Sequence, residues 1–165
     1  MKILGVDPGL RITGYGVIEV LRSANDFEIK LIEAGVIKTV DQSGIATRLE
    51  KIHRGLSEVI DELKPECLVI EKLYAHIKHP ATSILMGHAR GVVCLLSASK
   101  NIELVSMAST HVKKSVTGRG HAGKSQIQRM VQHALGLKVL PEPPDVADAL
   151  AVAISYASTL RKSNL

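Results

Sequence analysis

The chain has 165 residues, enough to bury a hydrophobic core, and we expect one domain over residues 1–165. With 45% hydrophobic and 22% charged residues it is not a disordered chain, and no apolar run approaches the ~20 residues of a membrane-spanning helix. The net charge of +5 suggests a polyanionic partner, whereas 2% aromatic residues argue against proteins that stack single strands on exposed rings.

The first half of the chain has the pattern of three strands, a helix and a fourth strand. The first apolar run stops at Asp7-Pro8-Gly9, a sequence typical of a turn. Two β-rich runs follow after short polar segments, which indicates an antiparallel meander. Apolar residues then recur at helical spacing, and the next apolar run ends at Glu71. The strands are expected over residues 2–6, 13–20, 28–38 and 67–70, and the helix over 49–63.

The second half of the chain contains one more predicted strand among helices. The strand is expected over residues 102–105, with helices over 81–99, 110–116, 127–135 and 145–160 and a flexible loop over 117–123. The whole order predicts an α/β fold in which a five-stranded mixed sheet is flanked by helices on both faces.

Four carboxylates are expected at one edge of this sheet. Asp7 and Glu71 each end a predicted strand, so both emerge at the carboxyl edge if the two strands are neighbours. Asp145 and Asp148 are three residues apart at the start of the last predicted helix and share a face. Four close carboxylates repel one another unless cations bind among them, and oxygen ligands without convergent Cys or His suit Mg²⁺ or Mn²⁺.

Each of these acids also has a simpler explanation. Asp7 before Pro-Gly can serve a turn, Asp145 can cap a helix, and Glu71 can be an exposed charge at a strand end. The residues by themselves therefore predict an acidic metal-binding site and no particular reaction. The two cysteines, Cys67 and Cys94, lie in apolar runs, which favours free thiols in a reducing compartment, and we expect a cytoplasmic protein.

Six short segments occur in an order that a known family shares. They are Leu4-Gly-Val-Asp7-Pro-Gly9, Thr13-Gly-Tyr-Gly16, Val69-Ile-Glu71, Ala89-Arg-Gly91, Lys124-Ser-Gln126 and Asp145-Val-Ala-Asp148-Ala-Leu-Ala. This set, above all its Asp-x-x-Asp-Ala-Leu-Ala ending, resembles the RuvC family of bacterial Holliday-junction resolvases, which have a ribonuclease-H-like fold. The similarity runs from residue 2 to about residue 157.

The resemblance implies a specific activity. Asp7, Glu71, Asp145 and Asp148 match the family's catalytic acids and would hold two Mg²⁺ ions, with Mn²⁺ as a substitute, across a scissile phosphate. A homodimer would cut two opposed strands of a four-way DNA junction symmetrically, in recombination and repair, and leave ligatable 5′-phosphate and 3′-hydroxyl ends. The RuvA–RuvB branch-migration complex is the implied protein partner.

Five further residues are candidates for DNA contacts. Lys113 and Lys124 match family positions thought to contact DNA near the scissile phosphate, and Lys114 and Arg119 add charge nearby. Tyr74 stands where the family tends to carry an aromatic residue, proposed to wedge against a junction base. A solvated lysine or a half-buried ring is the simpler explanation for each.

Two histidines depart from the family pattern, and one predicted helix carries a candidate dimer surface. His88 stands where relatives often have Gln, and His121 lies in the loop over residues 118–123. The helix expected over 81–99 carries more apolar side chains than one buried face needs, which suggests that it forms the dimer interface. These side chains are Leu85, Met86, Val92 and Leu95.

Other functions fit parts of the sequence. The segment Gly118–Ser125 satisfies the Walker A pattern, but the residues before it are too basic for the buried strand that a P-loop requires. The Asp7-x-Gly9 start also resembles actin-like ATPases, which need two such domains, and nucleases of the YqgF type, which the Asp145-x-x-Asp148 ending disfavours. A junction-binding protein without activity would need the cations but not the four acids.

Overall fold

The computed structural model describes residues 1–23, 26–72 and 80–162. Ten elements follow one another along the chain: β1 (Lys2–Asp7), β2 (Ile12–Arg22), β3 (Phe27–Lys38), α1 (Ile45–Leu63), β4 (Cys67–Glu71), α2 (Pro80–Ser99), β5 (Glu103–Met107), α3 (Ser109–Thr117), α4 (Lys124–Ala134) and α5 (Pro144–Lys162). The predicted order of elements is confirmed. The last strand ends at Met107, two residues beyond the predicted end, because Ser106 pairs with Ile70 despite its polar side chain.

The five strands form one mixed sheet in the order β3-β2-β1-β4-β5. β1 pairs antiparallel with β2, and β2 pairs antiparallel with β3, which confirms the meander. β1 and β4 run parallel as direct neighbours, with Val6 opposite Ile70, and β4 runs parallel to β5. The first and fourth strands therefore end at the same edge of the sheet.

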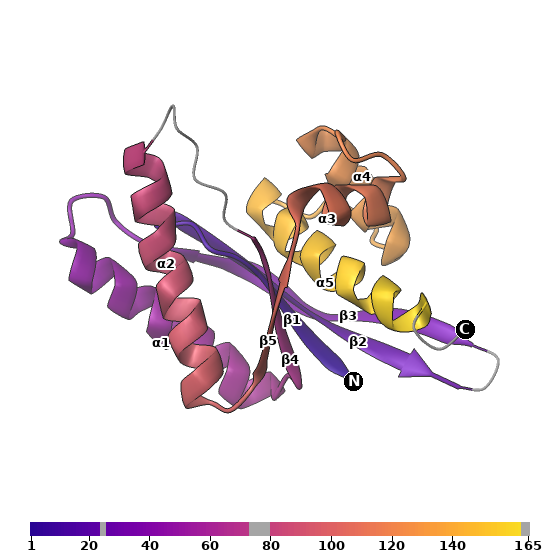
Figure 1. Ribbon diagram of the computed structural model, residues 1–165, viewed down its shortest axis with the longest axis horizontal. Coiled ribbons are helices and arrows are strands. Elements are labelled where there is room, and N and C mark those ends of the chain that lie inside the picture. The colour runs from indigo at the N-terminus through magenta and orange to yellow at the C-terminus, as the bar shows by residue number, and fades with distance from the viewer. Residues whose placement is uncertain (24–25, 73–79, 163–165) are drawn as a thin grey trace.

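Helices cover both faces of the sheet, as predicted. Figure 1 shows α1 and α2 on one side and α3, α4 and α5 on the other. Successive strand residues point to opposite faces. In β1, Leu4 and Val6 join the core under α1 and α2, whereas Ile3 joins the core under α5. Because β1 and β4 are buried on both faces, they are continuous apolar runs.

Glycines bring the backbone of α5 against the sheet. A Cβ atom at Gly5 would collide with the backbone carbonyl of Ala149, and one at Gly14 with that of Asp145. The facing part of α5 is rich in buried alanines, which also permit close approach. The start of α5 is thereby held over β1 and β2, next to the end of β1.

The apolar side chains predicted for a dimer surface fall into two groups. Leu85 and Leu95 are exposed on α2, and Ile84 beside them is 61% exposed. Val92 instead packs against the core, and Met86 lines a cleft described below. Within the described ranges, no helix is both long enough and apolar enough to cross a membrane.

Candidate functional site

The four predicted acids lie at one edge of the sheet. Asp7 is the last residue of β1 and Glu71 the last residue of β4, and these strands are parallel neighbours. Asp145 lies in the first turn of α5 and Asp148 lies three residues further along that helix. Gly14, which pairs with Asp7, is also the residue that touches the backbone of Asp145. Residues far apart in the sequence are thus brought together by strand pairing and by helix packing.

The turn after Asp7 is fixed by local hydrogen bonds. The amide of Gly9 donates to the carbonyl of Asp7 at 3.1 Å, and the buried Thr13 hydroxyl donates to the carbonyl of Gly9 at 2.7 Å. The Asp-Pro-Gly sequence therefore does form a turn, as its simpler explanation requires. It also leaves the carboxylate of Asp7 facing the start of α5.

Charge and burial act together on Asp7. Burial, together with the carboxylates of Asp148, Asp145 and Glu71, raises the pKa of Asp7 to about 7, although Lys124 acts to lower it. Burial also raises the pKa of Asp148, which Lys124 and Lys113 counteract. The four acids therefore interact electrostatically, as expected of carboxylates gathered in one place.

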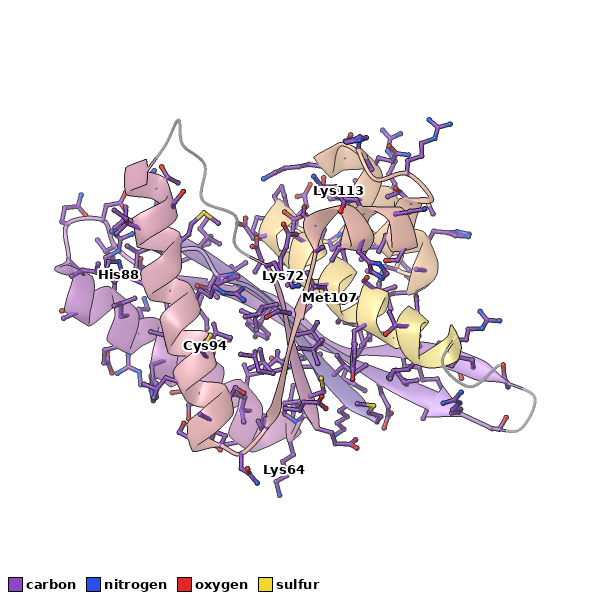
Figure 2. All side chains as sticks on the ribbon, in the orientation of Figure 1. Lys64, Lys72, His88, Cys94, Met107 and Lys113 are labelled. Carbon is purple, nitrogen blue, oxygen red and sulfur yellow. The ribbon has the colours of Figure 1, made fainter. Side chains whose placement is uncertain are left out.

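A cleft of about 720 Å³ lies beside these side chains, and Asp145 is not among the described residues of its wall. Three of the acids, Asp7, Glu71 and Asp148, lie in its wall, and four cations lie there too: Lys72, Arg90, Lys113 and Lys124. Figure 2 labels Lys72, just beyond the end of β4, and Lys113 on α3. A site with both signs of charge can hold cations at its acids and phosphate groups at its lysines.

The other predicted DNA contacts lie elsewhere. Lys114 and Arg119 are exposed and are not part of the cleft wall, although they belong to the same α3–α4 region. Tyr74 lies outside the described residues. Both His88 and His121 are exposed, on α2 and in the α3–α4 loop.

The acids suit a hard divalent cation by their chemistry, because they offer carboxylate oxygens and the described residues of the cleft wall include no Cys or His. Within the described parts of the chain, no three such side chains are already arranged as ligands of one ion. A divalent cation is most favoured at Asp7, because its charge would offset the burial and the repulsion from neighbouring carboxylates that raise the pKa of this residue.

Arg90 has no predicted role, although this residue belongs to one of the family-like segments. Its Nη1 donates to the backbone carbonyl of Glu71, and its Nη2 donates to Ser106 Oγ at 3.0 Å. The sequence of the helix alone could not predict these contacts, because the acceptors of Arg90 lie on two strands.

The Walker A match is not a P-loop. The segment Gly118–Ser125 connects α3 to α4, so a helix precedes it where a P-loop requires a strand. Gly118 ends α3 in a left-handed conformation, with φ of 74°, and Gly123 caps α4. The glycines of this segment therefore serve a helix–helix connection.

The model of one protein family, described as "Crossover junction endodeoxyribonuclease RuvC", matches residues 3–156. The chain belongs to the RuvC family. A RuvC crossover junction endodeoxyribonuclease of Rhodopirellula baltica is 47% identical over 92% of this chain and 83% of its own length. The RuvC protein of Desulforamulus reducens is 42% identical over 95% of this chain and 93% of its own. Membership of RuvC displaces the ATPase and YqgF alternatives.

Solved RuvC structures have the same fold. The RuvC of Thermus thermophilus in complex with a Holliday junction substrate aligns with a TM-score of 0.88 and 30% identity, covering 99% of this chain and 96% of that one. A second Thermus thermophilus RuvC structure aligns with a TM-score of 0.85 over 98% and 96% of the two chains. The predicted ribonuclease-H-like, five-stranded fold is thereby confirmed.

Proposed function

We propose that this RuvC-family protein resolves four-way DNA junctions by Mg²⁺-dependent hydrolysis of two opposed phosphodiester bonds. Family membership supports the reaction class, since its relatives are crossover junction endodeoxyribonucleases. The observation that carries the assignment of the site is the convergence of Asp7, Glu71, Asp145 and Asp148 from two strand ends and one helix.

The four acids are the proposed ligands of two Mg²⁺ ions. Bound Mg²⁺ would activate water for attack on phosphorus and stabilise charge on the leaving 3′ oxygen. The protein's part is to present ionised carboxylates at a fixed position. Asp7 is half-buried at a strand end and Asp148 lies on a packed helix, so the position of neither depends on a loop.

Lys113 and Lys124 are proposed to bind the phosphate groups on either side of the cut. Both line the cleft, and both lie close enough to Asp148 to lower its pKa. Neither lysine forms an ion pair, defined by a nitrogen–oxygen distance of up to 4.0 Å, with a carboxylate that the structure describes. Their charge is therefore available to a DNA strand that enters the cleft.

A wider basic region surrounds these two lysines. Residues 104–141 contain six Lys and Arg and no Asp or Glu, so they account for a charge of +6 within a chain of +5. The six are Lys113, Lys114, Arg119, Lys124, Arg129 and Lys138. None is in an ion pair with a residue that the structure describes. We propose that junction arms lie over this α3–α4 region, because unpaired cations release counterions from DNA.

The proposed protein partners are inferred from the symmetry of the junction and from family membership. A four-way junction cut at two opposed points calls for two active sites, and we propose a homodimer formed through the exposed apolar side chains of α2. Contact between Tyr74 and a junction base, and cooperation with RuvA–RuvB, remain proposals that rest on the family resemblance.

The test is cleavage of a labelled four-way junction and of a linear duplex with the same sequence. We expect paired nicks in the junction with Mg²⁺, none with a chelator, and little cutting of the duplex. Mn²⁺ should restore activity after chelation. Equal cutting of junction and duplex would contradict structure selectivity, and cutting in excess chelator would contradict the metal site.

A further inference from the structure

We infer that Arg90 is a positioning residue, which fixes the end of β4 and with it the orientation of the Glu71 carboxylate toward divalent cations. The inference rests on the proposed function, because it adds a residue to the proposed Mg²⁺ site. Arg90 itself is not a ligand, since a guanidinium offers only hydrogen-bond donors.

Arg90 joins three elements at the cleft. It stands midway along α2, and its two terminal nitrogens reach the ends of β4 and β5, at the carbonyl of Glu71 and the hydroxyl of Ser106. The guanidinium is planar and rigid, so two donors held in one plane fix the relative positions of their acceptors. A lysine at this position would offer one ammonium group and could not reproduce the fork.

The end of β4 is a place where such support matters. Pairing between β1 and β4 ends at Val6 and Ile70, so Glu71 lies beyond the last pair on that side. On the other side, Glu71 pairs with Met107, whose carbonyl accepts the amide of Lys72 at 2.7 Å. The bond from Arg90 adds a second constraint where the ladder with β1 has stopped. The Cα–Cβ direction of a residue follows its backbone, so this bond also sets the direction in which the side chain of Glu71 leaves the strand.

The other cations of the cleft are used differently. Lys72, Lys113 and Lys124 make no side-chain hydrogen bond or ion pair with the residues that the structure describes. Arg90 instead donates two hydrogen bonds to neutral acceptors of the protein. Its charge-assisted bonds therefore hold the protein framework, whereas the lysines are left for phosphate groups.

The test compares Arg90→Lys, which keeps the charge, with Ser106→Ala, which removes only the second acceptor. Arg54→Lys on α1, where Arg54 forms an exposed ion pair with Glu50, is the matched control. Three quantities are measured for each variant. They are the affinity of the DNA-free protein for Mg²⁺ by calorimetry, the affinity for a junction in chelator, and the rate of junction cleavage as a function of Mg²⁺ concentration. Thermal unfolding reports on the fold of each variant.

We expect Arg90→Lys to weaken Mg²⁺ binding by about tenfold and to raise the half-saturating Mg²⁺ concentration equally, as for other residues that support metal ligands. Junction affinity in chelator should stay at the parental value, and excess Mg²⁺ should restore part of the rate. Ser106→Ala should shift Mg²⁺ dependence in the same direction by less, and Arg54→Lys should shift nothing.

Parental Mg²⁺ dependence in a folded Arg90→Lys variant would overturn the inference. So would weakened junction binding with parental Mg²⁺ affinity, which would make Arg90 a phosphate contact. If Arg90→Lys does not fold, unchanged Mg²⁺ dependence in Ser106→Ala overturns it instead. A parent protein that neither binds Mg²⁺ nor cuts junctions would refute the proposed function itself, and this inference with it.

Discussion

At Asp7, burial and charge raise the pKa in the same direction. The pKa is about 7 in the folded chain against 3.8 for an ordinary Asp. At a pH between these two values, Asp7 is therefore protonated in the folded state and ionised in the unfolded state. The contribution of protonated Asp7 to the free energy of unfolding is therefore fully present below about pH 4 and is lost as the pH rises through 7. Ionised Asp7 thus destabilises the metal-free protein at neutral pH and above.

Asp7→Asn, which cannot ionise, should therefore stabilise the metal-free protein. We expect its free energy of unfolding in chelator to exceed the parent's by about 1–3 kcal/mol at pH 8, and the difference to vanish toward pH 4. Urea unfolding at several pH values measures it. A difference that does not change with pH would show that Asp7 titrates normally.

Lys124 opposes these carboxylates, since it lowers the pKa of both Asp7 and Asp148. Removing its charge in Lys124→Met should raise both pKa values and shift the pH dependence of Mg²⁺-dependent cleavage to higher pH. Single-turnover rates across neutral pH measure the shift. Lys138→Met is the matched control, because it removes one exposed lysine that affects neither pKa. Equal shifts in both variants would mean that only net charge matters.

At the scale of elements, α5 reaches its position because β1 and β2 present glycines to it. Gly14→Ala places a methyl group against the backbone of Asp145 and should force the start of α5 away from β1. We expect a loss of about 1–3 kcal/mol in the free energy of unfolding, as for overpacked cores. Cleavage should fall by more than this loss of folded protein explains.

The control for Gly14→Ala is Gly91→Ala on α2, where an added Cβ meets nothing within 4 Å. Alanine is favoured over glycine inside a helix, so this variant should be as stable as the parent or more so. Urea unfolding compares the two variants. A Gly14→Ala protein with parental stability and activity would show that α5 does not need this contact.

The elements also show which features the sequence could predict. Apolar runs and helical spacing predicted every strand and helix, and the placement of Asp7 and Glu71 at strand ends predicted their shared edge. The contact of α5 with Gly14 was not predictable, because it joins residues over 100 positions apart through packing. Arg90 was missed for the same reason, since its acceptors belong to other elements. The basic residues before the Walker A match predicted correctly that no buried strand precedes it.

At the scale of the whole molecule, charge and apolar surface are separated. The basic region lies on α3, on α4 and in the segments that follow each of them, whereas Ile84 and Leu95, 61% and 60% exposed, lie on α2. This arrangement allows one surface to hold DNA while another joins two copies of the chain.

Leu95→Glu should accordingly disrupt the proposed dimer without disturbing the core, because this side chain is already exposed. We expect sedimentation to show a monomer at concentrations where the parent is dimeric, with paired nicks replaced by slow single nicks. Leu21→Glu, at an exposed leucine on β2, is the control. A parent that sediments as a monomer while cutting both strands would contradict the proposed dimer.

Carboxylates distant in the sequence are proposed to form one metal-dependent cutting site. Single-turnover cleavage of a labelled four-way junction by Asp7→Asn, at protein concentrations that saturate binding, tests it most directly. We predict a loss of roughly a thousandfold or more in rate with Mg²⁺, while junction affinity in chelator is equal to or tighter than the parent's. Cleavage with Mg²⁺ at a rate near the parent's would contradict the account.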